Sequence, residues 1–247
     1  MKIGVVPARL DSTRLPSKIL AKLNGKPMVA HVMEMASEAK NLEKVILAVD
    51  SETTLEALKE YDFEMVMTSP EHASGTDRVA EVAKEIPEAE VIINIQGDEP
   101  LIEPDVIDSL VDSFEDDTVG ISTVVSSKLT VSDLLNPNVV KAIVDENHNA
   151  IEFKRNIFDL EIGGVYRHIG IYGFRRESLF HFISLGPSER ELDSKLEQLR
   201  ALDNGIPIRA AVTNYESFSV DTESDLDNVN RIMEEAGVVS DENNEKD

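Results

Sequence analysis

The sequence predicts an α/β fold in which helices flank a mixed, mainly parallel sheet. Short continuous apolar runs, amphipathic segments between them and polar clusters directly after the runs all support this prediction. Continuous apolar strands are typical of a parallel sheet that is covered on both faces. The 247 residues contain no repeat and no low-complexity linker. We therefore predict one domain over residues 1–237 and a disordered acidic tail over 238–247.

The elements follow from apolar runs for strands and from helical spacing of apolar residues for helices. In the first half we expect strands over 3–7, 44–49, 64–67 and 91–95, and helices over 27–39, 52–61 and 76–85. In the second half we expect strands over 118–125, 139–144 and 168–174, and a helix over 194–203. Residues 155–167 contain Gly163 and Gly164, and we expect them to leave the sheet as a hairpin at a subunit contact.

The composition excludes several classes of protein. A net charge of −24 argues against binding to nucleic acid, where a basic surface is expected. It fits a solvated acidic surface, with adaptation to high salt as one explanation. No apolar run reaches the roughly 18–20 residues of a membrane span, and the chain has no cysteine. We expect a cytoplasmic protein with no membrane partner.

A cationic loop follows the first predicted strand. Residues 7–26 hold Arg9, Arg14 and Lys18 together with two further lysines, and Asp11 is their only acid. Arginine and lysine bind phosphate oxygens, and the amides of a polar turn add donors. The loop lacks the glycines of a Walker motif. We interpret it as a polyphosphate site, the alternative being a solvated basic loop.

Two more polar clusters follow strands and should meet this loop at one edge of the sheet. Ser74, Gly75 and Thr76 precede a helix, where free amides and hydroxyls bind anions. An ordinary helix cap by Ser74 or Thr76 is the other interpretation, and both can hold together. Gln96 and Asp98 follow the strand over 91–95. A carboxylate there can hold Mg²⁺ against nucleotide phosphates, and a plain surface turn is the alternative.

These blocks resemble the 3-deoxy-manno-octulosonate cytidylyltransferase family, also called CMP-Kdo synthetases. The resemblance covers nearly the whole chain, in the order PARLDSTRLPSKIL, NGKPM, TSPEHASGTDR, NIQGDEPLI, NPNVVK, RHIGIYGFR, KLEQLRAL and SVDTESDL. It implies a nucleotidyltransferase-type, Rossmann-like fold. It also implies transfer of CMP from CTP to the anomeric hydroxyl of a 3-deoxy-2-ulosonic acid, with Mg²⁺ as cofactor and a homodimer as the assembly.

The resemblance also implies roles for individual residues. Lys18, Asp98 and Asp221 would be catalytic, with Asp98 and Asp221 holding the metal. The sugar acid would contact Gln96, Arg155, His168, Tyr172 and Gln198. Without the family, His168 is interpreted as a core or interface histidine. CTP would contact Pro7, Ala8, Arg9, Arg14, Lys18, Ser74, Gly75, Thr76, Arg78, Gln96 and Asp98.

The chain departs from the family pattern at a few positions. The family usually has glycine where Ser17 stands and proline where Ile19 stands, so a positive φ at Ser17 would cost about 1 kcal/mol. On the sugar side, Lys154 is an extra cation and Ser194 replaces a carboxylate. An 8-amino-octulosonate or a sialic-acid-like nonulosonate is therefore an alternative acceptor. A non-catalytic nucleotide-binding subunit is the alternative from another class.

Overall fold

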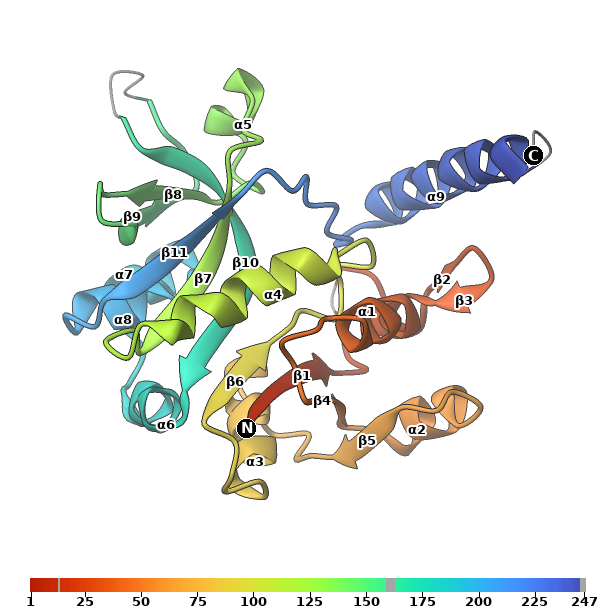
Figure 1. The fold of residues 1–247 in the computed structure, drawn as a ribbon, viewed down its shortest axis with the longest axis horizontal. Helices are drawn as coiled ribbons and strands as arrows, with labels where there is room; N and C mark the ends of the chain where they lie inside the picture. The colour runs from red at the N-terminus through yellow and green to blue at the C-terminus, as the bar shows by residue number, and fades with distance from the viewer. Residues whose placement is uncertain (13, 159–162, 245–247) are drawn as a thin grey trace.

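The computed structural model describes residues 1–12, 14–158 and 163–244. Within these residues, nine strands form one sheet in the order β5-β4-β1-β6-β10-β7-β11-β9-β8 (Figure 1). The strands are β1 (Lys2–Ala8), β4 (Lys44–Val49), β5 (Glu64–Met67), β6 (Val91–Asn94), β7 (Ile121–Ser126), β8 (Lys141–Val144), β9 (Asn149–Lys154), β10 (Val165–Arg175) and β11 (Ile208–Thr213). Helices flank the sheet, so the predicted mixed α/β fold is confirmed.

The helices connect these strands. The longer ones are α1 (Met28–Ser37), α3 (Gly75–Lys84), α4 (Pro104–Asp112), α6 (Arg176–Ser184) and α9 (Glu223–Asn244). The shorter elements are η1 (Lys18–Leu20), α2 (Glu52–Leu58), η2 (Ser113–Glu115), α5 (Val131–Leu135), α7 (Glu189–Ser194), α8 (Leu199–Asp203) and the hairpin of β2 (Lys22–Leu23) and β3 (Lys26–Pro27).

The strand directions place the polar loops at one edge. Strands β5, β4, β1 and β6 run parallel, as predicted for the first half of the chain. The loops after these strands therefore all leave the sheet on the same side. Beyond β6 the sheet changes character, because β10 is antiparallel to both β6 and β7 and β9 is antiparallel to its neighbours. The second half is thus mostly antiparallel.

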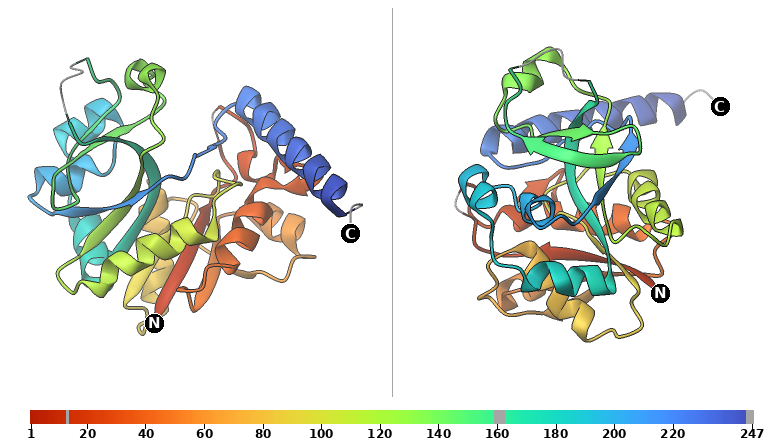
Figure 2. Two further views of the ribbon diagram at one scale, coloured as in Figure 1. Left: turned by 45° about the horizontal axis from the view of Figure 1, so that its top comes forward. Right: turned by 90° about the vertical axis from the view of Figure 1, so that its left-hand side faces the viewer.

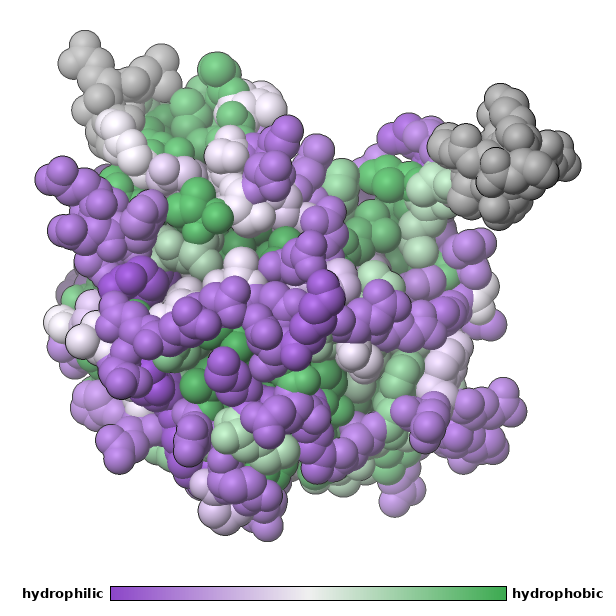
Figure 3. Space-filling model, viewed as in Figure 1, coloured by the Kyte–Doolittle hydropathy of each residue, from purple (hydrophilic) through white to green (hydrophobic). Residues whose placement is uncertain are grey.

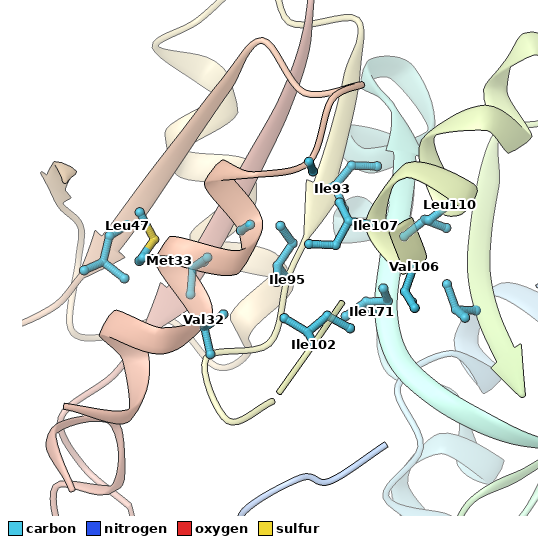
Figure 4. Packing of buried hydrophobic residues seen from close by; sticks show 14 of the residues in the cluster. Val32, Met33, Leu47, Ile93, Ile95, Ile102, Val106, Ile107, Leu110 and Ile171 are labelled. Atoms are coloured by element: carbon cyan, nitrogen blue, oxygen red, sulfur yellow. The ribbon is translucent and has the colours of Figure 1, made fainter. Parts of the chain in front are cut away.

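The core lies on both faces of the sheet. Helices α1 and α4 pack on one face, where Met33 of α1 lies beside Leu47 of β4 and Ile107 of α4 lies beside Ile93 of β6 (Figure 4). Helices α3, α6 and α8 supply buried residues to a second cluster on the opposite face, and Figure 2 shows the layers from two sides. Burying each such aliphatic side chain contributes roughly 1.5–3 kcal/mol.

The second half departs from the expected elements. The single helix expected over 194–203 is two short helices, α7 and α8, separated at Lys195, whose backbone is left-handed with φ 54°. The expectations also omitted α4, α6, β9, β11 and α9. In the segment expected as an excursion, β9 ends before residue 155 and β10 begins at Val165, while residues 159–162 lie outside the described residues.

The C-terminal segment packs beside the first loop. Val220 and Val229 form a small apolar cluster with Leu23 and Met28, and the Val220 amide donates to the Asp98 carbonyl oxygen at 2.9 Å. Helix α9 continues to Asn244 and so includes much of the segment predicted as a tail, of which residues 245–247 lie outside the described residues. The domain limits stay a prediction. Among the described helices, none has the length and apolar content needed to cross a membrane.

Candidate functional site

The first loop and two others surround a pocket at the carboxyl edge of the parallel strands. Arg9, Arg14 and Lys18 come from the loop after β1, Ser74 and Arg78 from the start of α3, and Asp98 from the turn after β6. The predicted convergence of these loops is confirmed. The full lining is Pro7, Arg9, Ser12, Arg14, Lys18, Ile19, His72, Ala73, Ser74, Gly75, Arg78, Gln96, Gly97, Asp98 and Asp221. Thr13 of the same loop lies outside the described residues.

Lys18 joins two carboxylates that lie far apart in the sequence. Its Nζ donates to Asp98 Oδ2 at 2.5 Å and to Asp221 Oδ1 at 2.9 Å. Arg14 reaches the same Asp221 oxygen at 3.0 Å. Burial favours the neutral amine, but the two carboxylates outweigh it and raise the pKa of Lys18. The lysine therefore stays charged and holds Asp98 and Asp221 side by side.

The pair of carboxylates fits a magnesium site completed by a substrate. Mg²⁺ commonly binds proteins through one or two carboxylates and takes its other oxygens from phosphates and water. The described residues contain no cluster of three or more histidine, cysteine or acidic side chains arranged to hold a metal. Asp98 and Asp221 are both partly exposed to the pocket, so their oxygens can reach a cation that also binds phosphate.

A pair of capping hydrogen bonds fixes the start of α3. The Ser74 hydroxyl accepts from the Asp77 amide, and Asp77 Oδ2 accepts from the Ser74 amide at 3.1 Å. The interpretation of Ser74 as a cap is confirmed. Gly75 packs against Pro7, because a Cβ at Gly75 would lie 3.3 Å from the proline ring. This close approach sets the cap next to the loop after β1.

Arg78 stabilises the pocket from behind. Its side chain is almost fully buried, donates to Asp50 Oδ2 at 3.1 Å and donates to the Thr68 hydroxyl at 2.5 Å. Asp50 also accepts from the Leu10 amide at 2.9 Å. The pair thus ties α3 to the ends of β1, β4 and β5. Asp50 was not expected in the site, although it directly follows the apolar strand β4 as Asp98 follows β6.

Two residues expected to bind CTP are not among those that line the first pocket. Ala8 is fully buried in the core cluster beneath α1. Thr76 faces away from the first pocket, and its hydroxyl donates to Glu197 Oε2 at 2.7 Å. Successive helical positions differ by about 100° in direction, so Ser74 and Gly75 can face one pocket while Thr76 faces another.

A second pocket lies next to the first, against β10. It contains all five residues expected to contact the sugar acid, namely Gln96, Arg155, His168, Tyr172 and Gln198. The complete lining is Arg14, Gly75, Thr76, Asn94, Gln96, Asn138, Val140, Arg155, His168, Gly170, Tyr172, Leu196, Glu197, Gln198 and Asp221. Arg14, Gly75, Gln96 and Asp221 line both pockets, so the two form one continuous cleft.

His168 and Tyr172 are placed by an irregularity in β10. The register against β7 shifts between Ile169 and Tyr172, and Thr123 of β7 fills the irregularity by bonding the carbonyls of Ile169 and Ile171. His168 Nε2 lies 3.0 Å from both the Thr123 hydroxyl and the Tyr172 hydroxyl. Such irregularities commonly redirect side chains at functional sites.

Both rings are neutral at ordinary pH. Burial lowers the pKa of His168 to about 3. Burial, assisted by the nearby Glu197 carboxylate, raises the pKa of Tyr172 well above its usual value. The pair therefore presents neutral hydrogen-bonding groups to the second pocket.

Part of the Arg155 guanidinium is hydrogen-bonded to backbone carbonyl oxygens. Its Nε donates to the Ser194 carbonyl at 2.7 Å, Nη1 to Pro137 at 2.9 Å and Nη2 to Lys195 at 3.1 Å. These contacts use three of the five N–H groups of the guanidinium. Among the described residues, the other two N–H groups have no hydrogen-bond partner.

The departures from the family pattern have distinct structural outcomes. Ser17 has φ 50° and ψ 37°, so it does occupy the left-handed conformation that favours glycine. Ile19 is buried and lines the first pocket.

On the sugar side, Ser194 contributes its carbonyl rather than its side chain to Arg155. Lys154 is exposed and lines a different groove with Phe158 and Arg190, so it supplies no cation to the second pocket.

Glu197 and Glu99 were also missed from the sequence. Glu197 lines the second pocket and accepts a hydrogen bond from the Thr76 hydroxyl there. Glu99 follows Asp98, is buried, and accepts from the Ser217 hydroxyl at 2.7 Å. Burial raises the pKa of Glu99 to about 7. In the sequence, the position of Glu99 next to Asp98 in the run QGDEP is what indicates that it lies near the site.

Comparison with known proteins gives the same family along nearly the whole chain. A family model described as cytidylyltransferase matches residues 3–236. The 3-deoxy-manno-octulosonate cytidylyltransferases of Geobacter metallireducens and Chloroherpeton thalassium are each 43% identical to this chain, over 93% of it and 96% of their own length. A solved structure of CMP:2-keto-3-deoxy-manno-octonic acid synthetase complexed with CTP superposes with a TM-score of 0.89 at 33% identity, covering 96% of this chain and 100% of that one.

The architecture of the sheet, the cleft at its carboxyl edge and these similarities agree with one another. The chain belongs to the cytidylyltransferases, in the family of 3-deoxy-manno-octulosonate cytidylyltransferases.

Proposed function

We propose that this protein transfers CMP from CTP to the anomeric hydroxyl of 3-deoxy-manno-octulosonate or a close relative, releasing pyrophosphate. The observation that carries the proposal is the divided cleft. One pocket holds four cations and a carboxylate pair, and the adjoining pocket holds Arg155 and neutral polar groups. A polyanionic nucleotide fits the first pocket, and an acidic sugar fits the second.

In the first pocket, Arg9, Arg14 and Lys18 bind the triphosphate and neutralise the charge of the departing pyrophosphate. Lys18 holds Asp98 and Asp221 together until the nucleotide supplies phosphate oxygens as new partners for its ammonium. Asp98 and Asp221 would hold Mg²⁺, which supplies Lewis-acid polarisation of the phosphate when bound. The Ser74 cap and Gly75 place free helix amides beside the nucleotide.

In the second pocket, the remaining donors of Arg155 pair with the carboxylate of the acceptor. Gln96 lines both pockets and so contacts both substrates. His168 and Tyr172 orient hydroxyls of the sugar. A ring whose pKa is about 3 is a weak base at neutral pH, so His168 binds the acceptor rather than removing its proton.

The reaction then proceeds by displacement in line. The anomeric oxygen forms a bond to the α-phosphorus of CTP, the bond from that phosphorus to the pyrophosphate oxygen breaks, and the hydroxyl proton passes to solvent. Holding both substrates in one cleft supplies much of the acceleration, because it converts an encounter of two molecules into a reaction within one complex.

Release of pyrophosphate tests the proposal. The protein is mixed with CTP, Mg²⁺ and, in separate reactions, 3-deoxy-manno-octulosonate, its 8-amino analogue and a sialic acid. We expect release with the first acid and loss of at least about a hundredfold in kcat for Asp98→Asn. Asp62→Asn, at an exposed position, is the matched control and should keep normal rates. Binding of CTP without release from any acid would instead favour a non-catalytic nucleotide-binding subunit.

The proposed assembly is a homodimer in the cytoplasm. Exposed apolar side chains lie near the segment expected at a subunit contact, among them Ile151, Phe158 and Leu192. Light scattering on the purified protein tests this part, and a mass of a single chain at micromolar concentration would contradict it.

A further inference from the structure

A fully buried lysine lies behind the second pocket. Lys141 is the first residue of β8 and has no exposed surface. Its Nζ donates to the carbonyl oxygens of Val139 at 2.7 Å, Asp133 at 2.9 Å and Asn136 at 3.0 Å, and also to that of Arg155. In the described part of the chain no carboxylate lies within ion-pair distance of it. Carbonyl oxygens therefore hydrogen-bond this buried ammonium directly, and the Asp133 carboxylate, beyond ion-pair distance, also favours its charge.

The carbonyls around Lys141 belong to a wall of the second pocket. One of them belongs to Asp133 of α5, and two belong to Asn136 and Val139 in the segment between α5 and β8. This segment also carries Asn138, which lines the pocket. The fourth belongs to Arg155, directly after β9. Lys141 thus fastens the segment over 133–139 to the end of β9.

Arg155 extends this connection to the opposite wall. Its guanidinium donates to Pro137 in the segment that Lys141 holds, and to Ser194 and Lys195 in the turn between α7 and α8. That turn leads into Leu196, Glu197 and Gln198 of the pocket lining. Lys141 and Arg155 are each hydrogen-bonded to main-chain oxygens. Together they fix the relative positions of three parts of the pocket wall: the segment over 133–139, the end of β9 and the turn after α7.

We propose that Lys141 is a positioning residue for the acceptor: it sets the backbone that places Arg155 and Asn138, and touches neither substrate itself. The proposal rests on the function given above, in which the second pocket binds the sugar acid. None of the residues around Lys141 lines the nucleotide pocket. Loss of the ammonium should therefore affect the acceptor and leave CTP binding unchanged.

The test is Lys141→Met, which keeps the length of the side chain and removes its donors. Without those donors, buried carbonyl oxygens must find new partners, and the segment must move to reach them. We expect KM for the sugar acid to rise by about tenfold or more, while the Kd for CTP, measured by calorimetry, changes by less than about twofold. Val144→Ala, at the far end of β8, is the matched control for a general loss of packing and should lower stability with no change in KM.

Lys141→Arg keeps the charge and several donors, and it replaces the methionine variant if that variant does not fold. We expect it to fold and to raise KM for the acid less than the methionine variant does. Wild-type KM for the acid in the folded methionine variant, or in the arginine variant if only that one folds, would overturn the proposal, as would equal losses of affinity for CTP and for the acid. Failure of the wild-type protein to use any sugar acid would contradict the proposed function instead, so the two failures are distinguishable.

Discussion

At Ser17 the backbone is held in the left-handed conformation directly before Lys18. A non-glycine residue there costs about 1 kcal/mol, and the serine side chain makes no capping hydrogen bond that would offset this cost. The structure keeps the conformation because Lys18, the next residue, is fixed by two carboxylates. The strain is therefore stored beside the lysine that is proposed to bind the triphosphate.

Ser17→Gly should raise the free energy of unfolding by about 1 kcal/mol, because glycine adopts a positive φ without strain. Urea denaturation with fluorescence or circular dichroism measures the change. Ser17→Ala is the matched control, since it retains the Cβ and should give no gain. Equal stability of the glycine and alanine variants would contradict the explanation.

His168 gives a prediction for pH. Its folded pKa of about 3 lies below the usual 6.5, so the unfolded chain binds a proton that the folded protein does not. The stability contributed by the neutral ring is therefore complete above pH 6.5 and is lost as pH falls toward 3.

His168→Gln should make stability less sensitive to acid, by up to about 1.4 kcal/mol for each pH unit below 6.5. Unfolding free energies between pH 6.5 and 4.5 test this. His181→Gln is the control, because His181 is exposed in α6 and faces solvent in both states. If the unfolding free energy of His168→Gln depends on pH as steeply as that of the wild type, the ring must be protonated in the folded protein over this range.

At the scale of elements, the buried pair of Arg78 and Asp50 joins α3 to β4 and to the loop after β1. Arg78→Met would leave the Asp50 carboxylate buried and unpaired, which costs about 3 kcal/mol. We expect this loss in urea denaturation, together with weaker binding of CTP because the loop is released. Combining Arg78→Met with Asp50→Leu should recover part of the lost stability. An unchanged urea midpoint for Arg78→Met alone would contradict the stabilising role of the pair.

The parallel half of the fold was predictable because each strand there is a continuous apolar run. Strands such as β4 and β6 are buried on both faces by helices, and this burial leaves a plain pattern in the sequence. Strand β9 is exposed at every few positions, including Ile151, and its pattern does not differ from that of a loop. The break at Lys195 depends on a left-handed residue fixed by tertiary contacts, which helical spacing cannot reveal.

The site was predictable to the same extent as the strands that position it. Arg9, Lys18 and Asp98 follow apolar strands, and parallel order brings such loops together. The supporting contacts were not predictable, because Lys141 and Asp50 act through backbone oxygens and a partner from another element. The sequence also did not show which pocket Thr76 lines, since the direction of a residue at a helix start depends on the rotation of the helix.

For the whole molecule, the net charge of −24 dominates the surface. The face in Figure 3 is largely hydrophilic, with apolar areas between the polar side chains. The cations of the first pocket are therefore a local exception on an acidic protein. Repulsion among surface carboxylates opposes folding at low ionic strength, and salt screens it.

The midpoint of thermal unfolding should rise when sodium chloride is increased from about 10 mM to about 500 mM. Screening that contributes about 1 kcal/mol corresponds to roughly 2–4 °C for a chain of this size. Differential scanning calorimetry measures the shift. A midpoint that stays constant or falls with salt would show that paired charges, rather than repulsion, determine the surface contribution.

The contact of Lys18 with Asp98 and Asp221 also has a consequence for biosynthesis. The lysine is separated from these partners by 80 and 203 residues of chain. Domains begin to fold from the N-terminus while the ribosome is still adding residues. A growing chain therefore holds the cationic loop and Asp98 long before Asp221 emerges. The three groups meet only after Asp221 has been synthesised, so no chain that ends before it has the whole site.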